Sequence, residues 1–160
     1  MCFWGHTPHG SQAVGPWVLS QWLESPFEVD GATYRTAEHW MMAGKATLFG
    51  DGATRDQILS ARTPGEAKAL GRRVRGFHEA AWQAHRMALV VEGNVHKFSQ
   101  HPALGEYLRS TARRVLVEAS PVDRVWGIGL AADHPDATQP QAWRGLNLLG
   151  FALMEARARL

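Results

Sequence analysis

A glutamate and a lysine share one face of a predicted apolar helix. Residues 37–49 are rich in large apolar side chains; they follow Thr36, a typical N-cap, and Gly50 provides a typical helix end. On such a helix Glu38 and Lys45 lie on the face that carries the large apolar side chains. Because that face should point inward, a carboxylate and an ammonium group are directed toward the interior together.

Burying two ions is costly unless they are paired, hydrogen-bonded or used in chemistry. The rise between the two positions is roughly 10 Å, which is too long for an easy direct ion pair. One interpretation is that Glu38 and Lys45 flank a cavity. The other is that Lys45 extends its stem toward solvent while Glu38 caps the first turn of its own helix. The spacing alone favours neither interpretation.

Composition is typical of a folded globular protein. The chain has 160 residues, of which 45% are apolar and 20% charged, and we expect a single domain over residues 1–160. No apolar run approaches the ~18–20 residues of a membrane span, and the first residues lack the pattern of a signal peptide. A single cysteine, Cys2, fits a reducing compartment, so we expect a cytoplasmic protein. No heptad pattern predicts a coiled coil, and we expect a monomer.

The order of elements predicts an α+β class, mostly helical with a few short strands. An Asp-Gly turn at Asp30 and Gly31 predicts a hairpin over residues 27–34. After the first helix, further helices are expected at 56–61, 64–74, 78–92, 102–110 and 143–159. Gly93 and Asn94 are expected to end the fourth of these six helices, with a further turn at 96–100. A strand is expected at 115–119, an extended segment at 125–130, and loops at 6–16 and 131–141.

Four segments place polar residues beside aromatic residues and glycines: 38–45, 93–98, 118–129 and 143–150. In the third, an acid, a base, a tryptophan and two glycines follow a strand, which suits close approach of the backbone to a ligand. Its Gly-x-Gly lacks the third glycine of a dinucleotide-binding motif. Asn147, in the fourth segment, either contacts a ligand or forms a structural hydrogen bond to the loop around Asp123.

Metal and cofactor chemistry is weakly supported. The histidines lack the spacing of metal ligands; His6 and His9 lie in a loop without a third ligand. No nucleophile elbow is present, and Cys2 is a poor nucleophile candidate. We therefore expect neither a metal nor a cofactor. Arginine clusters, such as the one around Arg72, suit phosphate binding or form solvated helix faces, and the seven tryptophans suit a ring-shaped ligand.

Taken in order, these motifs resemble the NADAR family, also called YbiA-like. The resemblance covers nearly the whole chain. It rests on Phe3-Trp4-Gly5, Ser25-Pro26-Phe27, Val29-Asp30-Gly31, Tyr34, Thr36 to Ala46, Leu48-Phe49-Gly50-Asp51, Ala67 to Arg72, Gly93-Asn94, Lys97-Phe98, Leu116 to Pro121, Asp123-Arg124, Trp126 to Gly129, and Gly145 to Gly150. One departure is Leu19-Ser20-Gln21, where family members often read Leu-Ser-Asn, and this puts a ligand role for position 21 in doubt.

The resemblance implies a YbiA-like fold and an N-glycosidase that breaks the bond between ribose C1 and a nitrogen next to a phosphate. Implied substrates are ADP-ribosyl-guanine in DNA or RNA and phosphoribosylamino-pyrimidine intermediates of riboflavin biosynthesis. The competing class is a non-catalytic module that binds ADP-ribose or nucleic acid, which would not need Lys45.

We assign catalytic roles to three residues: Lys45 as nucleophile, Glu38 as general acid/base, and Asp123 as a group that positions a sugar hydroxyl or water. A carboxylate can stabilise the positive charge that develops on the sugar, and a desolvated lysine can attack C1 as a free amine. The expected substrate-binding residues are Phe3, Trp4, Gly5, Ser20, Arg72, Trp82, Asn94, Lys97, Arg124, Trp126, Gly127 and Asn147.

Overall fold

A long central helix separates two groups of elements. The computed structural model describes residues 1–8 and 13–160. Its α-helices are α1 (Ala37–Leu48), α2 (Gly52–Ser60), α3 (Pro64–Gly71), α4 (Glu79–Gln100), α5 (Pro102–Ser110) and α6 (Leu148–Ala158). Its strands are β1 (Cys2–Phe3), β2 (Phe27–Val29), β3 (Ala32–Tyr34) and β4 (Val117–Glu118). Short 3₁₀ helices are η1 (Pro16–Leu19), η2 (Pro135–Thr138) and η3 (Pro140–Ala142). The predicted α+β class, mostly helical with few short strands, is confirmed.

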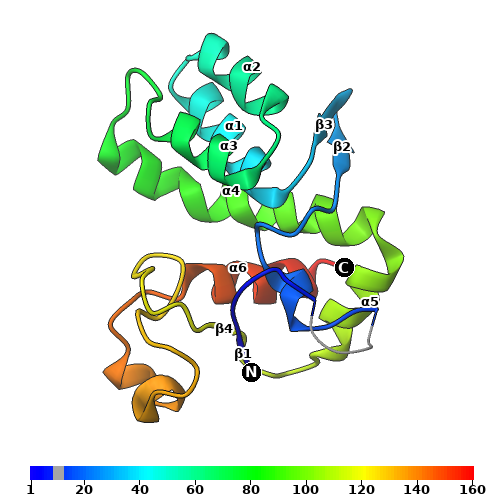
Figure 1. The fold of residues 1–160 in the computed structure, drawn as a ribbon, viewed down its shortest axis with the longest axis vertical. Helices are drawn as coiled ribbons and strands as arrows, with labels where there is room; N and C mark the ends of the chain where they lie inside the picture. The colour runs from blue at the N-terminus through cyan, green and yellow to red at the C-terminus, as the bar shows by residue number, and fades with distance from the viewer. Residues whose placement is uncertain (9–12) are drawn as a thin grey trace.

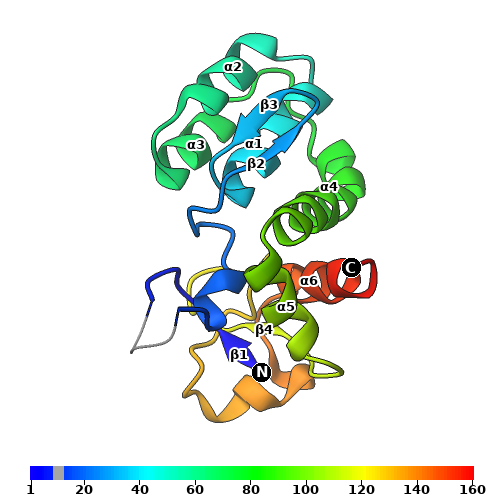
Figure 2. The ribbon, with the colours of Figure 1, turned by 90° about the vertical axis from the view of Figure 1, so that its right-hand side faces the viewer.

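Helix α4 is the centre of this arrangement (Figure 1). On one side it packs against α1, and α2 and α3 pack on α1 in turn. On its other side it packs against α6 and α5. Strands β1 and β4 form a parallel pair in this second group, whereas β2 and β3 form an antiparallel hairpin in the first. Viewed from the side, the two groups lie one above the other with α4 between them (Figure 2).

The first helix and the hairpin before it form as the sequence predicts. The Thr36 hydroxyl accepts the His39 backbone N–H and so caps α1. The turn between β2 and β3 has Asp30 and Gly31 both at positive φ, 50° and 77°, as a tight hairpin with right-handed twist requires. Gly50 follows α1 with φ of 70°, the usual left-handed conformation past a helix end.

The predicted break at Gly93 and Asn94 is wrong, because α4 runs through both residues to Gln100. A glycine inside a helix costs about 1 kcal/mol relative to alanine, so its presence needs a reason. A Cβ atom on Gly93 would lie 2.3 Å from Cδ1 of the Trp40 ring. Gly93 therefore lets α1 approach α4 closely. The helical conformation of Gly93 is therefore set by the packing of α1 against α4, which outweighs the local preference of glycine for a helix end.

The C-terminal part also differs from the prediction. The last helix begins only at Leu148, because Asn147 adopts a left-handed conformation with φ of 53°. Residues 125–130 form a series of bends, not an extended segment, and the predicted strand at 115–119 is limited to Val117 and Glu118. The loop at 131–141 contains η2 and most of η3.

Smaller differences occur in the first half. Helix α2 begins at Gly52, earlier than predicted, because the Asp51 carboxylate accepts the Thr54 N–H. Helix α3 begins as predicted but ends at Gly71, before position 74. Of the loop predicted at 6–16, residues 9–12, including His9, lie outside the described residues. No helix in the described part of the chain is both long and apolar enough to span a membrane.

Candidate functional site

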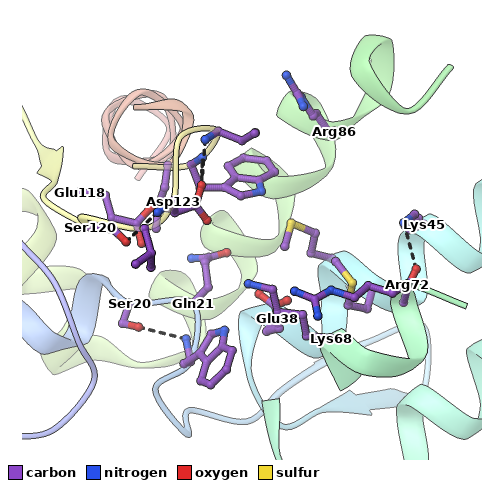
Figure 3. Close-up of a pocket in the computed structure, with 18 of the residues that line it drawn as sticks. Ser20, Gln21, Glu38, Lys45, Lys68, Arg72, Arg86, Glu118, Ser120 and Asp123 are labelled. Carbon is purple, nitrogen blue, oxygen red and sulfur yellow. Dashed lines mark hydrogen bonds between the residues drawn. The ribbon is translucent and has the colours of Figure 1, made fainter. Parts of the chain in front are cut away.

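A cleft of about 710 Å³ lies between the α1–α3 group and the segment that follows β4. Its volume is in the range of pockets that hold a small-molecule ligand. Residues from α1, α3 and α4 form one wall, and the N-terminal segment, the residues after η1 and residues 118–126 form the other (Figure 3). The cleft is therefore assembled from parts of the chain that are far apart in sequence.

The structure brings many of the predicted site residues together on this cleft. These are Glu38, Lys45, Asp123, Trp4, Gly5, Ser20, Arg72, Trp82 and Trp126. The rest of the predicted set is not part of the lining: Phe3, Asn94, Lys97, Arg124, Gly127 and Asn147. The cleft thus lies between two of the polar segments noted in the sequence, residues 38–45 and residues 118–129.

Three of the predicted residues outside the lining have structural contacts instead. Lys97 is fully buried, and its Nζ donates to the carbonyl oxygens of Val18 and Ser20 at 2.7 and 2.8 Å. Asn94 is buried too and accepts a hydrogen bond from Gln21 at 3.0 Å. Phe3 packs in the hydrophobic core. Lys97 and Asn94 therefore hold the segment of residues 18–21 that reaches the cleft.

Glu38 is the most deeply buried charged residue of the lining, with 3% of its surface exposed. Burial raises its pKa to about 7, although the positive charge of Lys68, a hydrogen bond from Trp22 and the charge of Arg72 oppose the rise. Its Oε1 atom has no hydrogen-bond partner among the described residues. Thr36 caps the helix, so Glu38 is not needed as a cap. A buried carboxyl group with an unpaired oxygen at a cleft is typical of a proton-transfer group.

Lys45 lies farther along α1 in the same cleft. Its Nζ donates to the Gly71 carbonyl oxygen at 2.9 Å and lies 4.3 Å from the centre of the Phe77 ring. Burial lowers its pKa, while the nearby Glu79 acts in the opposite direction. The interpretation in which Glu38 and Lys45 flank a cavity is therefore confirmed, because both line the same cleft.

The wall opposite Glu38 carries two further carboxyl groups. Burial first, and then the charge of Asp123, raises the pKa of Glu118 to about 8. Glu118 Oε2, like Glu38 Oε1, lacks a hydrogen-bond partner among the described residues. Asp123 Oδ1 accepts the backbone N–H groups of Val125 and Trp126, both at 2.8 Å, and this fixes its carboxylate at the cleft.

Several residues of the cleft were not predicted from the sequence as site residues. The basic and acidic ones are Lys68, Arg86, Glu79 and Glu118, and the others include Gln21, Trp22 and Phe77. Lys68 and Glu118 lie inside motifs of the family resemblance, so a signal for both was present. Gln21, whose position was in doubt, is buried in the cleft wall. Within the described residues, no group of three or more histidine, cysteine, aspartate or glutamate side chains is arranged to hold a metal ion.

Comparison with known proteins identifies the family of the chain. A model of the NADAR domain matches residues 2–160. The chain belongs to the NADAR family. Among its relatives, N-glycosidase R617 of Acanthamoeba polyphaga mimivirus is 42% identical over 157 residues, which are 95% of this chain and 92% of the viral protein. The N-glycosidase YbiA of Escherichia coli (strain K12) is 33% identical over 142 residues, which are 89% of this chain and 80% of YbiA.

Two further comparisons concern a plant protein and a solved structure. The chloroplastic riboflavin biosynthesis protein PYRR of Zea mays is 36% identical over 138 residues, which are 82% of this chain and 20% of that protein. The NMR structure of E. coli YbiA superposes with a TM-score of 0.75 at 27% identity, and the match covers 99% of this chain and 83% of that one. The family resemblance inferred from the motifs is therefore confirmed.

Proposed function

We propose that this NADAR protein is an N-glycosidase that hydrolyses the bond between ribose C1 and a nitrogen in a phosphate-bearing substrate. Glu38 carries the proposal: it is a buried cleft carboxyl group with an unpaired oxygen and a pKa of about 7. Such a group can exchange protons at neutral pH, as cleavage of a glycosidic bond requires. The names of the mimivirus and E. coli relatives support the same reaction class.

The rest of the cleft suits the remaining parts of such a substrate. Lys68, Arg72 and Arg86 supply positive charge for phosphate groups. Trp4 is 58% exposed at the cleft, where its ring is available for stacking on a base. The substrates that the family resemblance implies, an ADP-ribosyl group on guanine in DNA or RNA and a phosphoribosylamino-pyrimidine, both have these parts. The riboflavin biosynthesis relative favours the second of these.

Lys45 is the proposed nucleophile. Its neutral amine forms a bond to C1 as the C1–N bond breaks, and the bonding electrons leave with the nitrogen, which takes up a proton. The ring then opens: the C1–O4 electron pair goes to O4, which takes a proton from the lysine nitrogen, and a Schiff base remains. Water adds to C1, the amine leaves, and O4 closes the ring again. Glu38 transfers protons in these steps, and Asp123 positions a sugar hydroxyl or the water.

A substrate panel read by mass spectrometry tests the function. ADP-ribosylated guanine in DNA, the same group in RNA, and a phosphoribosylamino-pyrimidine are each incubated with the protein. We expect one of them to be cleaved: a nucleic acid would release ADP-ribose and keep its guanine, and the phosphoribosylamino-pyrimidine would release the pyrimidine and ribose 5-phosphate. Tight binding without product from any of these substrates would contradict the proposal and favour a non-catalytic binding module.

Borohydride trapping tests the nucleophile separately. Reduction during turnover should leave a sugar-phosphate or ADP-ribose adduct on the peptide that contains Lys45. Lys45→Arg, which keeps the charge but cannot act as a neutral amine, should show neither adduct nor turnover. Lys68 is the second lysine of the cleft and provides the matched control: Lys68→Met should bind the phosphate-bearing substrate less tightly but should still form the adduct when the substrate is saturating. An adduct on Lys68, or turnover by Lys45→Arg, would overturn this role for Lys45.

A further inference from the structure

Glu118 faces Glu38 across the cleft, yet neither the sequence motifs nor the comparisons assign it a role. Both residues line the cleft, and each has one carboxyl oxygen without a hydrogen-bond partner among the described residues. An unpaired buried polar atom in a native protein needs an explanation, and a ligand that completes the hydrogen bond is one. Two such atoms on opposite walls indicate that both carboxyl groups contact the same bound molecule.

The backbone of Glu118 is held on both sides. The side-chain oxygen of Asn147 accepts the Glu118 N–H at 2.9 Å, and its amide donates to the Leu116 carbonyl oxygen at 2.9 Å. The Glu118 carbonyl oxygen accepts the N–H of Ile128 at 2.9 Å. A Cβ atom on Gly127 would lie 2.9 Å from that same oxygen, so only glycine fits there without a shift. Asn147 and Gly127, which the sequence analysis expected to bind substrate, thus fix the position of Glu118.

Lys68 and Asp123 act on both glutamates, but their order of strength differs: the charge of Lys68 is the stronger at Glu38, and the charge of Asp123 is the stronger at Glu118. For Glu38 the strongest neighbouring charge is that of Lys68 on α3, which favours the carboxylate. For Glu118 the strongest is that of Asp123 on its own loop, which favours the protonated form, and Glu38 on α1 acts in the same direction. Two acids whose surroundings push their protonation apart take different roles in catalysis. This order favours the protonated form at Glu118, which has Asp123 on its own loop, and the carboxylate at Glu38, which has Lys68 across from it on α3.

We infer that Glu118 is the general acid of this site, which protonates the departing nitrogen, and that Glu38 is the carboxylate that assists the incoming water. The inference rests on the proposed N-glycosidase function. As the C1–N bond breaks, both bonding electrons pass to the nitrogen, which takes the Glu118 proton. The water whose oxygen ends on C1 gives one proton to Glu38, and this proton returns to Glu118 to complete the cycle.

Glu118→Gln and the pH dependence of kcat/KM provide the experiment. The substrate is the N-glycoside that the wild-type protein cleaves, and 4-nitrophenyl β-ribofuranoside 5-phosphate is the comparison, because its leaving group departs without a proton. We expect Glu118→Gln to lose at least about 10²-fold on the N-glycoside and much less on the nitrophenyl compound. The wild-type rate on the N-glycoside should fall as pH rises through about 8, and Glu118→Gln should lack that fall.

Each result bears on a separate claim. The role of Glu118 would be overturned if Glu118→Gln kept the fall in rate above about pH 8, or if it lost the same factor in rate on the two substrates. The N-glycosidase function would stand in either case. Absence of N-glycoside cleavage by the wild-type protein would overturn the function itself. If Glu118→Gln does not fold, the wild-type protein alone tests the inference, because both substrates can be compared on it. The same fall in kcat/KM at alkaline pH on both substrates would contradict the inference. Glu106→Gln, an exposed residue away from the cleft, is the matched control.

Discussion

Replacing Glu38 by glutamine should make the protein more stable at alkaline pH while it abolishes most of its activity. The pKa of Glu38 is about 7 in the folded protein against an ordinary 4.5, so the folded protein holds a proton that the unfolded chain releases. The free energy of unfolding therefore falls as pH rises from about 4.5 to about 7, and it stays lower above that range. A shift of this size corresponds to about 3 kcal/mol. Glutamine has the same shape and no charge, and so avoids this loss.

Thermal unfolding at two pH values measures the effect. For a chain of this length about 3 kcal/mol corresponds to a Tm difference of roughly 6–12 °C. We expect Glu38→Gln to unfold at a higher temperature than wild type at about pH 9 and at nearly the same temperature at about pH 5. In the activity assay it should lose at least about 10²-fold in rate. Glu155→Gln, at an exposed position on α6, should change neither quantity.

The outcome that would refute this reasoning is a Tm difference between Glu38→Gln and wild type that is the same at both pH values. Glu38 would then be ionised or neutral in both the folded and the unfolded protein at each pH, and burial would not control its protonation. Unchanged kinetics together with a lower Tm would instead identify Glu38 as a purely structural residue.

Two further changes test the packing of α1 and the binding of phosphate. Gly93→Ala forces a Cβ atom to within 2.3 Å of Trp40, whose ring N–H donates to the Leu89 carbonyl oxygen and would be strained by a shift of the ring. The overpacking cost of about 1–3 kcal/mol should exceed the helix-propensity gain of about 1 kcal/mol. We therefore expect Tm to fall by a few degrees. Gly52→Ala, at a helical position with open space around it, should be neutral or slightly stabilising, and equal Tm values for the two variants would contradict the packing argument. Arg72→Ala should raise KM at least about tenfold for the phosphate-bearing substrate and much less for its dephosphorylated form, since charge-assisted hydrogen bonds contribute about 1.5–3 kcal/mol. Arg73→Ala, next to it but outside the cleft lining, should leave KM unchanged, and an equal effect of the two arginines would contradict a specific contact.

Local sequence signals were sufficient to predict the helix that carries Glu38 and Lys45. Its cap at Thr36, its apolar face and its glycine end all act within a few residues, so periodicity and capping identify them. The same holds for the Asp-Gly hairpin, whose turn conformation depends on two adjacent residues. The helical period placed Glu38 and Lys45 on the apolar face of this helix, whereas only the structure shows that both side chains line a cleft.

Other features depend on contacts that a local pattern does not contain. Gly93 reads as a helix end, but the ring of Trp40 on another helix gives it a place inside α4. Asn147 reads as part of a helix, but its side chain bridges two backbone groups of the β4 segment. Glu118 was visible as one acid in a polar segment, and only the opposite wall of the cleft shows why its burial matters. The surroundings of Gly93, Asn147 and Glu118 are set by contacts between distant parts of the chain, which a local sequence pattern does not describe.

The parallel pairing of β1 with β4 has a consequence for how the protein folds. Phe3 pairs with Glu118, more than one hundred positions later in the chain, whereas α1, α2 and α3 pack on one another as near neighbours in sequence. Contacts between distant segments carry a larger loop-closure entropy and form more slowly than local ones. The wall that carries Glu38 can therefore assemble early, while Glu118 reaches its place only when two distant parts of the chain have joined. A newly made chain would become helical before it becomes competent for chemistry.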